Sequence, residues 1–255
     1  MKLRVGAVNF LNAYPLWADL KDDPSITLSL DTPANLARQL QAGDLDVALI
    51  SSIEVFRSGK EFGTISGLGI IADKKSDSIR LFLREAPATF GSNIHTLREI
   101  FTDSASRSSV AQLQIILNQL YWRGQLSETD KKISLLENLS ANEGLLAIGD
   151  FALKNRSRPS VDVQSIYYDL FRQPMVYALW CYRKINPPLD LSRFMTAYRT
   201  FMMHRKDEVH QAAKRFGFDV EFCDEYLNGI IRYELDESAM TGLEFFKSNV
   251  LDDRV

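Results

Sequence analysis

Apolar runs alternate with segments of helical spacing over the first 55 residues. Thr32 followed by Pro33 predicts a helix start, because Thr caps a helix well and proline fits its first turn. Gly43 predicts the end of that helix. Strands are expected over residues 3–8, 26–30 and 47–51, and a further helix over 12–20. This alternating order predicts a parallel sheet with right-handed crossovers.

The middle of the chain carries a second set of alternating elements. We expect strands over residues 66–72, 78–83, 132–136, 144–148 and 175–182, a short helix over 95–101, and a loop over 155–164. The clearest helix follows Ser104–Ser106, where apolar residues recur at spacings of three and four until Gly124. The last quarter is expected to be helical, over residues 191–204, 207–216, 219–232 and 237–251.

This organisation predicts an α/β protein of two lobes. Residues 81–83 and 176–182 are apolar and extended, and we expect them to be the two crossover strands that join the lobes. Lobe one is then discontinuous and comprises residues 1–83 and 184–255, and lobe two comprises residues 84–183. A cleft between two such lobes is a natural place for a small-molecule ligand.

Composition narrows the class of partner. The 255 residues include 30 Lys and Arg and 33 Asp and Glu, which gives a formal net charge of −3. That balance offers no basic field for nucleic acid or an anionic membrane. Asn9, Asn12 and Pro15 interrupt the N-terminal apolar stretch, so neither a secretion signal nor a membrane span is expected, and the cytoplasm is the expected compartment. Two cysteines do not form a disulfide framework, and buried free thiols are favoured for Cys181 and Cys223 over a pair.

The usual catalytic motifs are absent from the sequence. The chain has no HExxH, CxxC, Walker A or GxSxG pattern. His95, His204 and His210 occupy polar helical positions, for which surface or structural roles are favoured. No acidic residues cluster with His or Cys, so no metal and no cofactor is expected.

Small polar residues instead follow the apolar strands. Ligands of open parallel sheets bind outside the carboxyl ends of the strands. Each of these residues, taken alone, is better explained as a helix cap or a turn former. Taken together they predict a ligand rim, because all fall on the same side of the expected sheets. The rim residues are Asn9, Ser51, Ser52, Gly149 and Asp150.

The segment from Asp103 to Leu113 is the best candidate for an anion site. Its serines precede the strongest amphipathic helix, and a helix start presents free N–H groups and partial positive charge. Ser108 and Ser109 add hydroxyl donors, and Arg107 adds a planar cation suited to a carboxylate. A plain serine N-cap beside a solvated Arg107 explains the same residues, and the two interpretations stay open at this point.

Five segments together resemble the chorismate dehydratase family of the futalosine route to menaquinone. The resemblance covers most of the chain, in order and at matching spacing. The N-F-L-N and S-R-S-S forms are closer to this family than to the naphthoate synthase of the same pathway. The segments are VGAVNFLNAYPL (Val5–Leu16), PANLARQLQAGDLDVALISSIEVFR (Pro33–Arg57), SASRSSVAQL (Ser104–Leu113), LLAIGDFAL (Leu145–Leu153) and QPMVYALWCYR (Gln173–Arg183).

The resemblance implies a type-II periplasmic-binding-protein fold and a hydro-lyase reaction. Chorismate, a small dicarboxylate, would lose water to give 3-[(1-carboxyvinyl)oxy]benzoate. The sequence departs from the family pattern at Asn142–Gly144, which lacks an expected aspartate, and at Phe171–Gln173, which replaces a small-residue turn and adds the cation Arg172. Either departure would reshape the lobe-two side of the ligand site.

The matching motifs also suggest roles for individual residues. Ser51 with Ser52, and the helix start with Ser106, Arg107, Ser108 and Ser109, would bind the two carboxylates, and Gly149 would shape the neighbouring loop. Asn9 or Asn12 would orient the substrate or assist the leaving hydroxyl. Asp150 is a candidate base, although it could be a helix cap and a substrate carboxylate could take the proton. The sister naphthoate synthase and a non-catalytic small-anion-binding protein remain the alternative functions.

Overall fold

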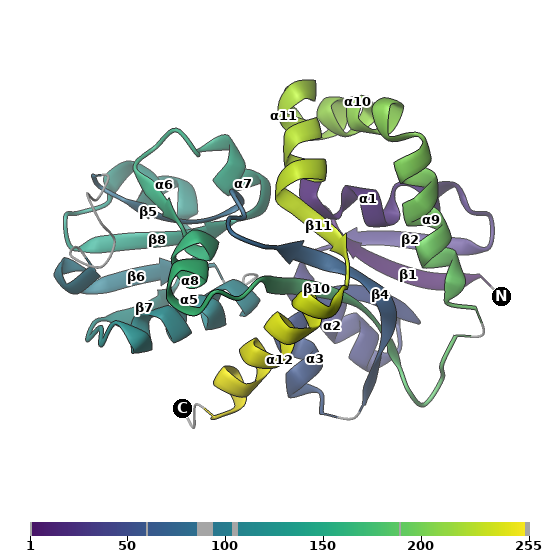
Figure 1. Ribbon diagram of the computed structural model, residues 1–255, viewed down its shortest axis with the longest axis horizontal. Helices are drawn as coiled ribbons and strands as arrows, with labels where there is room; N and C mark the ends of the chain where they lie inside the picture. The colour runs from purple at the N-terminus through teal and green to yellow at the C-terminus, as the bar shows by residue number, and fades with distance from the viewer. Residues whose placement is uncertain (1, 60, 86–93, 104–106, 189, 253–255) are drawn as a thin grey trace. The chain divides into compact units, whose positions relative to one another are not determined.

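The computed structural model describes residues 2–59, 61–85, 94–103, 107–188 and 190–252. The chain forms two compact units. Unit 1 contains the chain up to Ile71 together with Val176–Met240, and unit 2 contains Ala72–Met175 together with the chain from Thr241 onward. Both units are therefore built from segments that are distant in the sequence (Figure 1).

The sheet of unit 1 has the strand order β11-β4-β10-β3-β1-β2. β1 pairs in parallel with β2 and β3, whereas β10 runs antiparallel to β3. The central strands β1 and β3 are almost wholly buried, as expected for strands covered on both faces. The bounds are β1 (Leu3–Val8), β2 (Ile26–Asp31), β3 (Val47–Ser51), β4 (Phe62–Ala72), β10 (Met175–Arg183) and β11 (Ile231–Glu234).

Helices cover the sheet of unit 1. The helix α2 packs on β1 and β3, and α1 packs on α9 (Figure 1). The cap geometry of α2 matches the expectation, because Thr32 Oγ1 accepts a hydrogen bond from the N–H of Asn35 and Gly43 has a φ of 84°. The helices are α1 (Tyr14–Trp17), α2 (Pro33–Ala42), α3 (Ser52–Arg57), α9 (Ser192–Met203), α10 (Arg205–Phe216) and α11 (Val220–Glu225), and 3₁₀ turns span Leu11–Ala13 and Asp19–Asp22.

The cap of α2 gives a stability prediction. Thr32→Ala is expected to lower the free energy of unfolding by about 1 kcal/mol, because the N–H of Asn35 loses its acceptor. Urea denaturation measures the change. Thr196→Ala is the control, since that exposed hydroxyl only donates to the Ser192 carbonyl within α9. Equal stability of the two variants would contradict a capping role for Thr32.

The sheet of unit 2 has the strand order β7-β6-β8-β5-β9. β6 is parallel to β7 and β8, and β5 is antiparallel to β8 and β9. Phe82, Leu145 and Ala152 lie in its buried core. The strands are β5 (Ile79–Leu83), β6 (Glu99–Thr102), β7 (Gln125–Glu128), β8 (Glu143–Ile148) and β9 (Ser160–Asp162). The helices are α5 (Arg107–Gln119), α6 (Lys132–Asn138), α7 (Gly149–Lys154) and α8 (Val163–Phe171), and α12 (Glu237–Asp252) joins this unit from Thr241.

Most expected elements are confirmed, and four are wrong in part or in full. Residues 95–101 contain a 3₁₀ turn and β6 instead of a helix, and residues 132–136 form α6 instead of a strand. The expected loop over 155–164 contains β9 and the start of α8. The expected helix over 219–232 ends in a π-helical turn at Tyr226–Ile230, after which the chain enters β11.

The unit boundaries also differ from the expected domains. β5, expected in lobe one, pairs with β8 and β9 inside the second sheet. The first passage between units therefore lies at the end of β4, between Ile71 and Ala72, and not after residue 83. The return at Val176 falls within the expected crossover segment, and the end of the chain belongs to unit 2.

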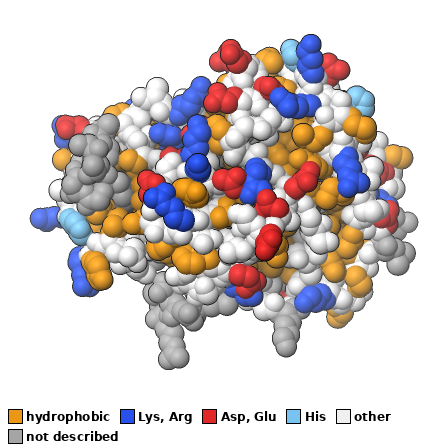
Figure 2. All heavy atoms as spheres, viewed as in Figure 1, with side chains coloured by type: hydrophobic (Ala, Val, Ile, Leu, Met, Phe, Trp, Pro, Cys, Tyr) orange, Lys and Arg blue, Asp and Glu red, His pale blue; other side chains and the backbone are white. Residues whose placement is uncertain are grey.

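The state of the two cysteines follows the expectation from composition. Cys181 and Cys223 are buried and form no disulfide with each other, and burial raises the pKa of the Cys181 thiol. Acidic and basic side chains are mixed over the visible face in Figure 2. None of the helices in the described ranges has the length and apolarity that crossing a bilayer requires.

Candidate functional site

Two of the predicted rim residues meet at the carboxyl ends of β1 and β3, which we call the carboxyl edge of unit 1. Val5 pairs with Val47 and Gly6 with Ala48 in parallel register. Extending that register places Asn9 beside Ser51. The parallel pairing thus brings together two polar residues that are 42 positions apart in the sequence.

The loop after β1 presents two asparagines in different environments. Asn9 is exposed, and its Oδ1 accepts a hydrogen bond of 3.2 Å from Nη2 of Arg215. Asn12 is half-buried in the 3₁₀ turn, where its neighbours Leu11 and Ala13 are fully buried. The Oδ1 atom of Asn12 is buried and has no hydrogen-bond partner among the described residues. A buried acceptor without a partner is costly, so it marks a position suited to a ligand donor.

The two serines after β3 have different surroundings. The Ser51 side chain is 8% exposed and makes no capping bond at the start of α3. Ser52 is fully buried, and its hydroxyl donates to the Val176 carbonyl at 2.7 Å. That bond fastens α3 to β10 and uses the hydroxyl proton within the fold. The geometry therefore favours Ser51 over Ser52 as a donor to a ligand.

A cation that the sequence analysis did not single out lies at the same edge. The guanidinium of Arg215, in the last turn of α10, lies 4.9 Å from the ring centroid of the buried Trp17. It also donates to Asn9. No motif marks Arg215, because a basic residue in the last helical turn is explained by the helix dipole alone.

A buried tyrosine holds α10 against α1 in unit 1. The Tyr14 hydroxyl donates to the Glu208 carboxylate at 2.9 Å. Burial, together with that bond, raises the pKa of Tyr14 far above its usual value, so Tyr14 remains a neutral donor at physiological pH. Its ring also packs edge-on against Trp17 and Phe216. These contacts fix the helix that carries Arg215.

The other predicted site residues meet at the carboxyl ends of β6 and β8, which we call the carboxyl edge of unit 2. Thr102 and Leu146 pair in parallel register, so α5 after β6 and α7 after β8 begin at the same edge. Arg107 is exposed at the start of α5, whereas Ser108 and Ser109 are buried. Ser106 lies outside the described residues.

The turn after β8 is held by backbone contacts. Gly149 has a φ of 62°, a conformation that suits glycine, and its N–H donates to the Ser78 carbonyl at 2.8 Å. Asp150 follows in the first turn of α7 and is half-buried. Asp150 therefore lies at the carboxyl edge of unit 2, near the start of a short helix.

A second carboxylate at this edge, that of Asp103, was given no role from the sequence. Asp103 directly follows β6, and Lys132 forms an ion pair with it at 2.5 Å. The Lys132 ammonium also lies 5.6 Å from the ring centroid of Phe151, the neighbour of Asp150. Lys132 was expected in a strand, so its approach to Asp103 could not be foreseen. Asp103 therefore has a lysine partner at this edge.

A third carboxylate supports the loop before β5. The backbone N–H groups of Ser76, Asp77 and Ser165 all donate to Asp162, which caps α8. Burial raises the pKa of Asp162, and these backbone donors oppose that shift. Ser78, at the end of the same loop, accepts from Gly149. Asp162 thus supports the turn that carries Asp150.

The two departures from the family pattern make contacts within unit 2. The Asn142 carbonyl accepts from the N–H of Arg98 at 2.8 Å, at the amino end of β8 and so at the edge opposite Asp150. Arg172 ends α8 with a φ of 56° and lies 3.4 Å from Asp169 and 5.5 Å from the Tyr168 ring centroid. Both departures are accommodated by local contacts within unit 2.

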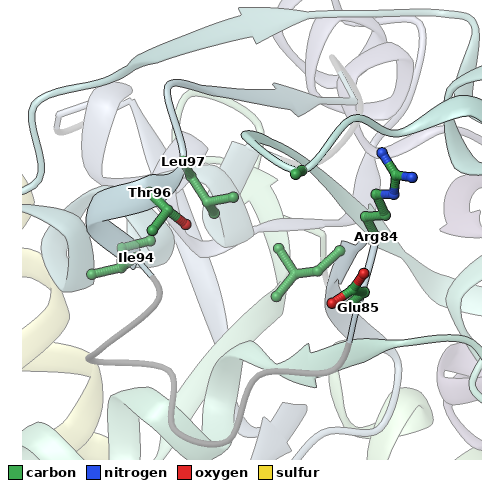
Figure 3. Close-up of a pocket in the computed structure, with 7 residues that line it drawn as sticks. Arg84, Glu85, Ile94, Thr96 and Leu97 are labelled. Carbon is green, nitrogen blue, oxygen red and sulfur yellow. The ribbon is translucent and has the colours of Figure 1, made fainter.

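A cavity of about 130 Å³ lies at that opposite edge of unit 2. In Figure 3, Arg84 and Glu85 face Ile94, Thr96 and Leu97 across it. None of the predicted site residues within the described ranges lines this cavity. The described residues also contain no group of three or more His, Cys, Asp or Glu side chains that could hold a metal ion.

Comparisons with known proteins agree with the fold and identify the family. The chain is 11% identical to protein AF1704 of Archaeoglobus fulgidus, with a TM-score of 0.70 over 98% of this chain and 97% of that structure. It is 12% identical to the periplasmic aliphatic sulphonate binding protein SsuA of Escherichia coli, with a TM-score of 0.67 over 99% and 87%. These likenesses show a periplasmic-binding-protein fold.

The sequence comparisons are more specific. The chain is 27% identical to the chorismate dehydratase of Thermus thermophilus, over 95% of this chain and 93% of the relative. The family model described as "Menaquinone biosynthesis" matches residues 3–250. The chain therefore belongs to the menaquinone biosynthesis family.

Proposed function

We propose that this protein is a chorismate dehydratase, a hydro-lyase that converts chorismate to 3-[(1-carboxyvinyl)oxy]benzoate and water for menaquinone synthesis. The observation that carries the proposal is the match to a chorismate dehydratase over nearly the full length of both chains, within the menaquinone biosynthesis family. The polar residues at the two carboxyl edges suit a small dicarboxylate substrate.

The reaction demands little of the protein beyond binding and electrostatics. The C3–H bond breaks, its electron pair forms the C3–C4 double bond, and the C4–O bond breaks to release hydroxide. The hydroxide takes up a proton and leaves as water. Because the ring becomes aromatic, the main task is to hold one conformation and to stabilise the charge that develops.

The residues at the edges offer groups for each of these tasks. Arg107, Ser108 and Ser109 at the start of α5 provide a cation, hydroxyls and backbone N–H groups for a carboxylate. Ser51 provides a further hydroxyl at the edge of unit 1.

Two asparagines and one aspartate are left for the reacting ring. Asn9 or Asn12 supplies the amide that orients the ring or assists the leaving hydroxyl. Two groups are available as the base, the carboxylate of Asp150 and a carboxylate of the substrate itself.

Mass-resolved chromatography of chorismate incubated with the purified protein tests the proposal. The expected product is lighter than chorismate by one water and has an aromatic ultraviolet spectrum. Chorismate that stays unchanged, while raising the melting temperature of the protein, would indicate binding without dehydration and would contradict the proposed reaction. If chorismate is not converted and does not raise the melting temperature, the sister enzyme of the pathway becomes the favoured function.

A further inference from the structure

We propose that Arg215, together with Asn9, forms an anion subsite at the carboxyl edge of unit 1 that binds one carboxylate of the substrate. This inference rests on the proposed function for the identity of the substrate. No motif of the sequence includes Arg215, and the assignment follows from its contacts. Three observations support it, namely a fixed guanidinium, an unneutralised charge and a position beside Ser51.

The guanidinium of Arg215 is held in place before any ligand binds. Its Cζ atom lies over the Trp17 indole, 4.9 Å from the ring centroid, and Trp17 is itself only 1% exposed. A hydrogen bond of 3.2 Å from Nη2 to Asn9 Oδ1 fixes its rotation. A stacked, hydrogen-bonded arginine loses less side-chain freedom when it binds a carboxylate, so binding is tighter.

The charge of Arg215 lacks an acidic partner in the described part of the chain. Two other arginines of unit 1, Arg4 and Arg205, each have an acidic partner. Arg4 lies 2.6 Å from Asp46, and Arg205 lies 2.8 Å from Asp224. The polar partner of Arg215 is the neutral amide of Asn9, which occupies one N–H donor of five. The remaining donors and the full positive charge are available to an anion.

The position of Arg215 suits a substrate carboxylate. Asn9 lies beside Ser51 in the register of β1 and β3, so the guanidinium is at the edge where open α/β sheets bind ligands. Chorismate carries two negative charges, and Ser51 has no positive charge to offset one of them. The Ser52 hydroxyl already donates its hydrogen bond to the Val176 carbonyl. Arg215 therefore supplies the cation that the Ser51 side of the site lacks.

Steady-state kinetics and calorimetric titration with the product test the subsite. Arg215→Gln is expected to raise both KM for chorismate and Kd for 3-[(1-carboxyvinyl)oxy]benzoate about 10- to 100-fold, as expected for loss of a charge-assisted hydrogen bond. The effect on kcat is expected to be smaller than the effect on KM. Lys214→Gln is the matched control, because it removes the same charge from the same helical turn.

The control and two further measurements separate binding from a structural role. Lys214→Gln is expected to keep the wild-type KM and Kd. Arg215→Lys keeps the charge but not the guanidinium that lies over Trp17, so its Kd is expected to fall between those of the wild type and Arg215→Gln. Millimolar guanidinium is expected to restore product binding in Arg215→Ala. Guanidinium would not restore binding if Arg215 acted only through packing.

The outcomes distinguish this inference from the proposed function. A wild-type protein that does not dehydrate chorismate contradicts the function. A wild-type protein that does so, while folded Arg215→Gln keeps the wild-type KM and Kd, contradicts only the subsite. Equal losses of binding in Arg215→Gln and Lys214→Gln would also overturn the subsite, because they would reduce it to a general effect of charge.

Discussion

Asn12→Ala is expected to lower kcat for chorismate about 100- to 1,000-fold while the melting temperature stays equal to, or rises above, that of the wild type. The two effects have one cause. Asn12 Oδ1 is buried without a hydrogen-bond partner among the described residues, so the amide reduces stability in the free protein. We expect the Asn12 amide to bind the substrate. Its removal would therefore stabilise the fold and slow the reaction.

Asn228 provides the opposite case for comparison. Its Nδ2 donates to the carbonyl and to the carboxylate of Asp224, so its amide stabilises the helical turn that follows α11. Asn228→Ala is expected to lower the melting temperature and to leave kcat unchanged. Thermal denaturation and steady-state kinetics on both variants give the comparison. Wild-type kcat in Asn12→Ala would remove Asn12 from the reaction.

Asp162→Ala is expected to have the largest effect on stability, a loss of about 2–4 kcal/mol in the free energy of unfolding. The backbone N–H groups of Ser76, Asp77 and Ser165 would lose their shared acceptor, and α8 would lose its cap. Because Ser78 follows in the same loop and accepts from Gly149, kcat is expected to fall as well. Urea denaturation at pH 7 measures the stability change.

Two variants calibrate the effect of Asp162. Asp162→Asn keeps one acceptor oxygen and is expected to lose less stability than Asp162→Ala. Asp190 accepts from the N–H and hydroxyl of Ser192 in an exposed turn, so Asp190→Ala is expected to change stability by less than about 1 kcal/mol. Equal losses in Asp162→Ala and Asp190→Ala would show that the three backbone donors to Asp162 do not determine the loss of stability.

The elements predicted well from sequence are those with local signals. Thr32, Pro33 and Gly43 set the ends of α2 through capping and backbone conformation, and no distant residue is needed. The helix expected over residues 95–101 fails because Glu99–Thr102 pairs with strands on both sides, β7 and β8. Local helical spacing cannot report those partners, which lie 26 and 44 residues further along the chain.

The strand expected over residues 132–136 fails for a related reason. Its apolar residues suit a strand or a short helix, and length and periodicity do not separate the two. The true edge strand, β7, is polar and half-exposed, and so carries no apolar signal. The unit boundary is displaced because β5 and β4 are both apolar, and only pairing shows that β5 belongs to the second sheet.

The candidate site was predictable as far as strand ends allow. Asn9 and Ser51 meet because parallel strands share a carboxyl edge, which the alternating pattern already implies. Arg215 and Asp103 could not be found in this way. Arg215 meets Asn9 across 206 residues of sequence, and the partner of Asp103 is a lysine on a helix that the pattern assigned to a strand.

The proposed reaction removes the C3 proton and the C4 hydroxyl of chorismate. The mass of the product formed from chorismate deuterated at C3 reports both losses at once. We expect 3-[(1-carboxyvinyl)oxy]benzoate without deuterium. Labelled chorismate recovered unchanged, or a product that retains the deuterium, would contradict the proposed reaction.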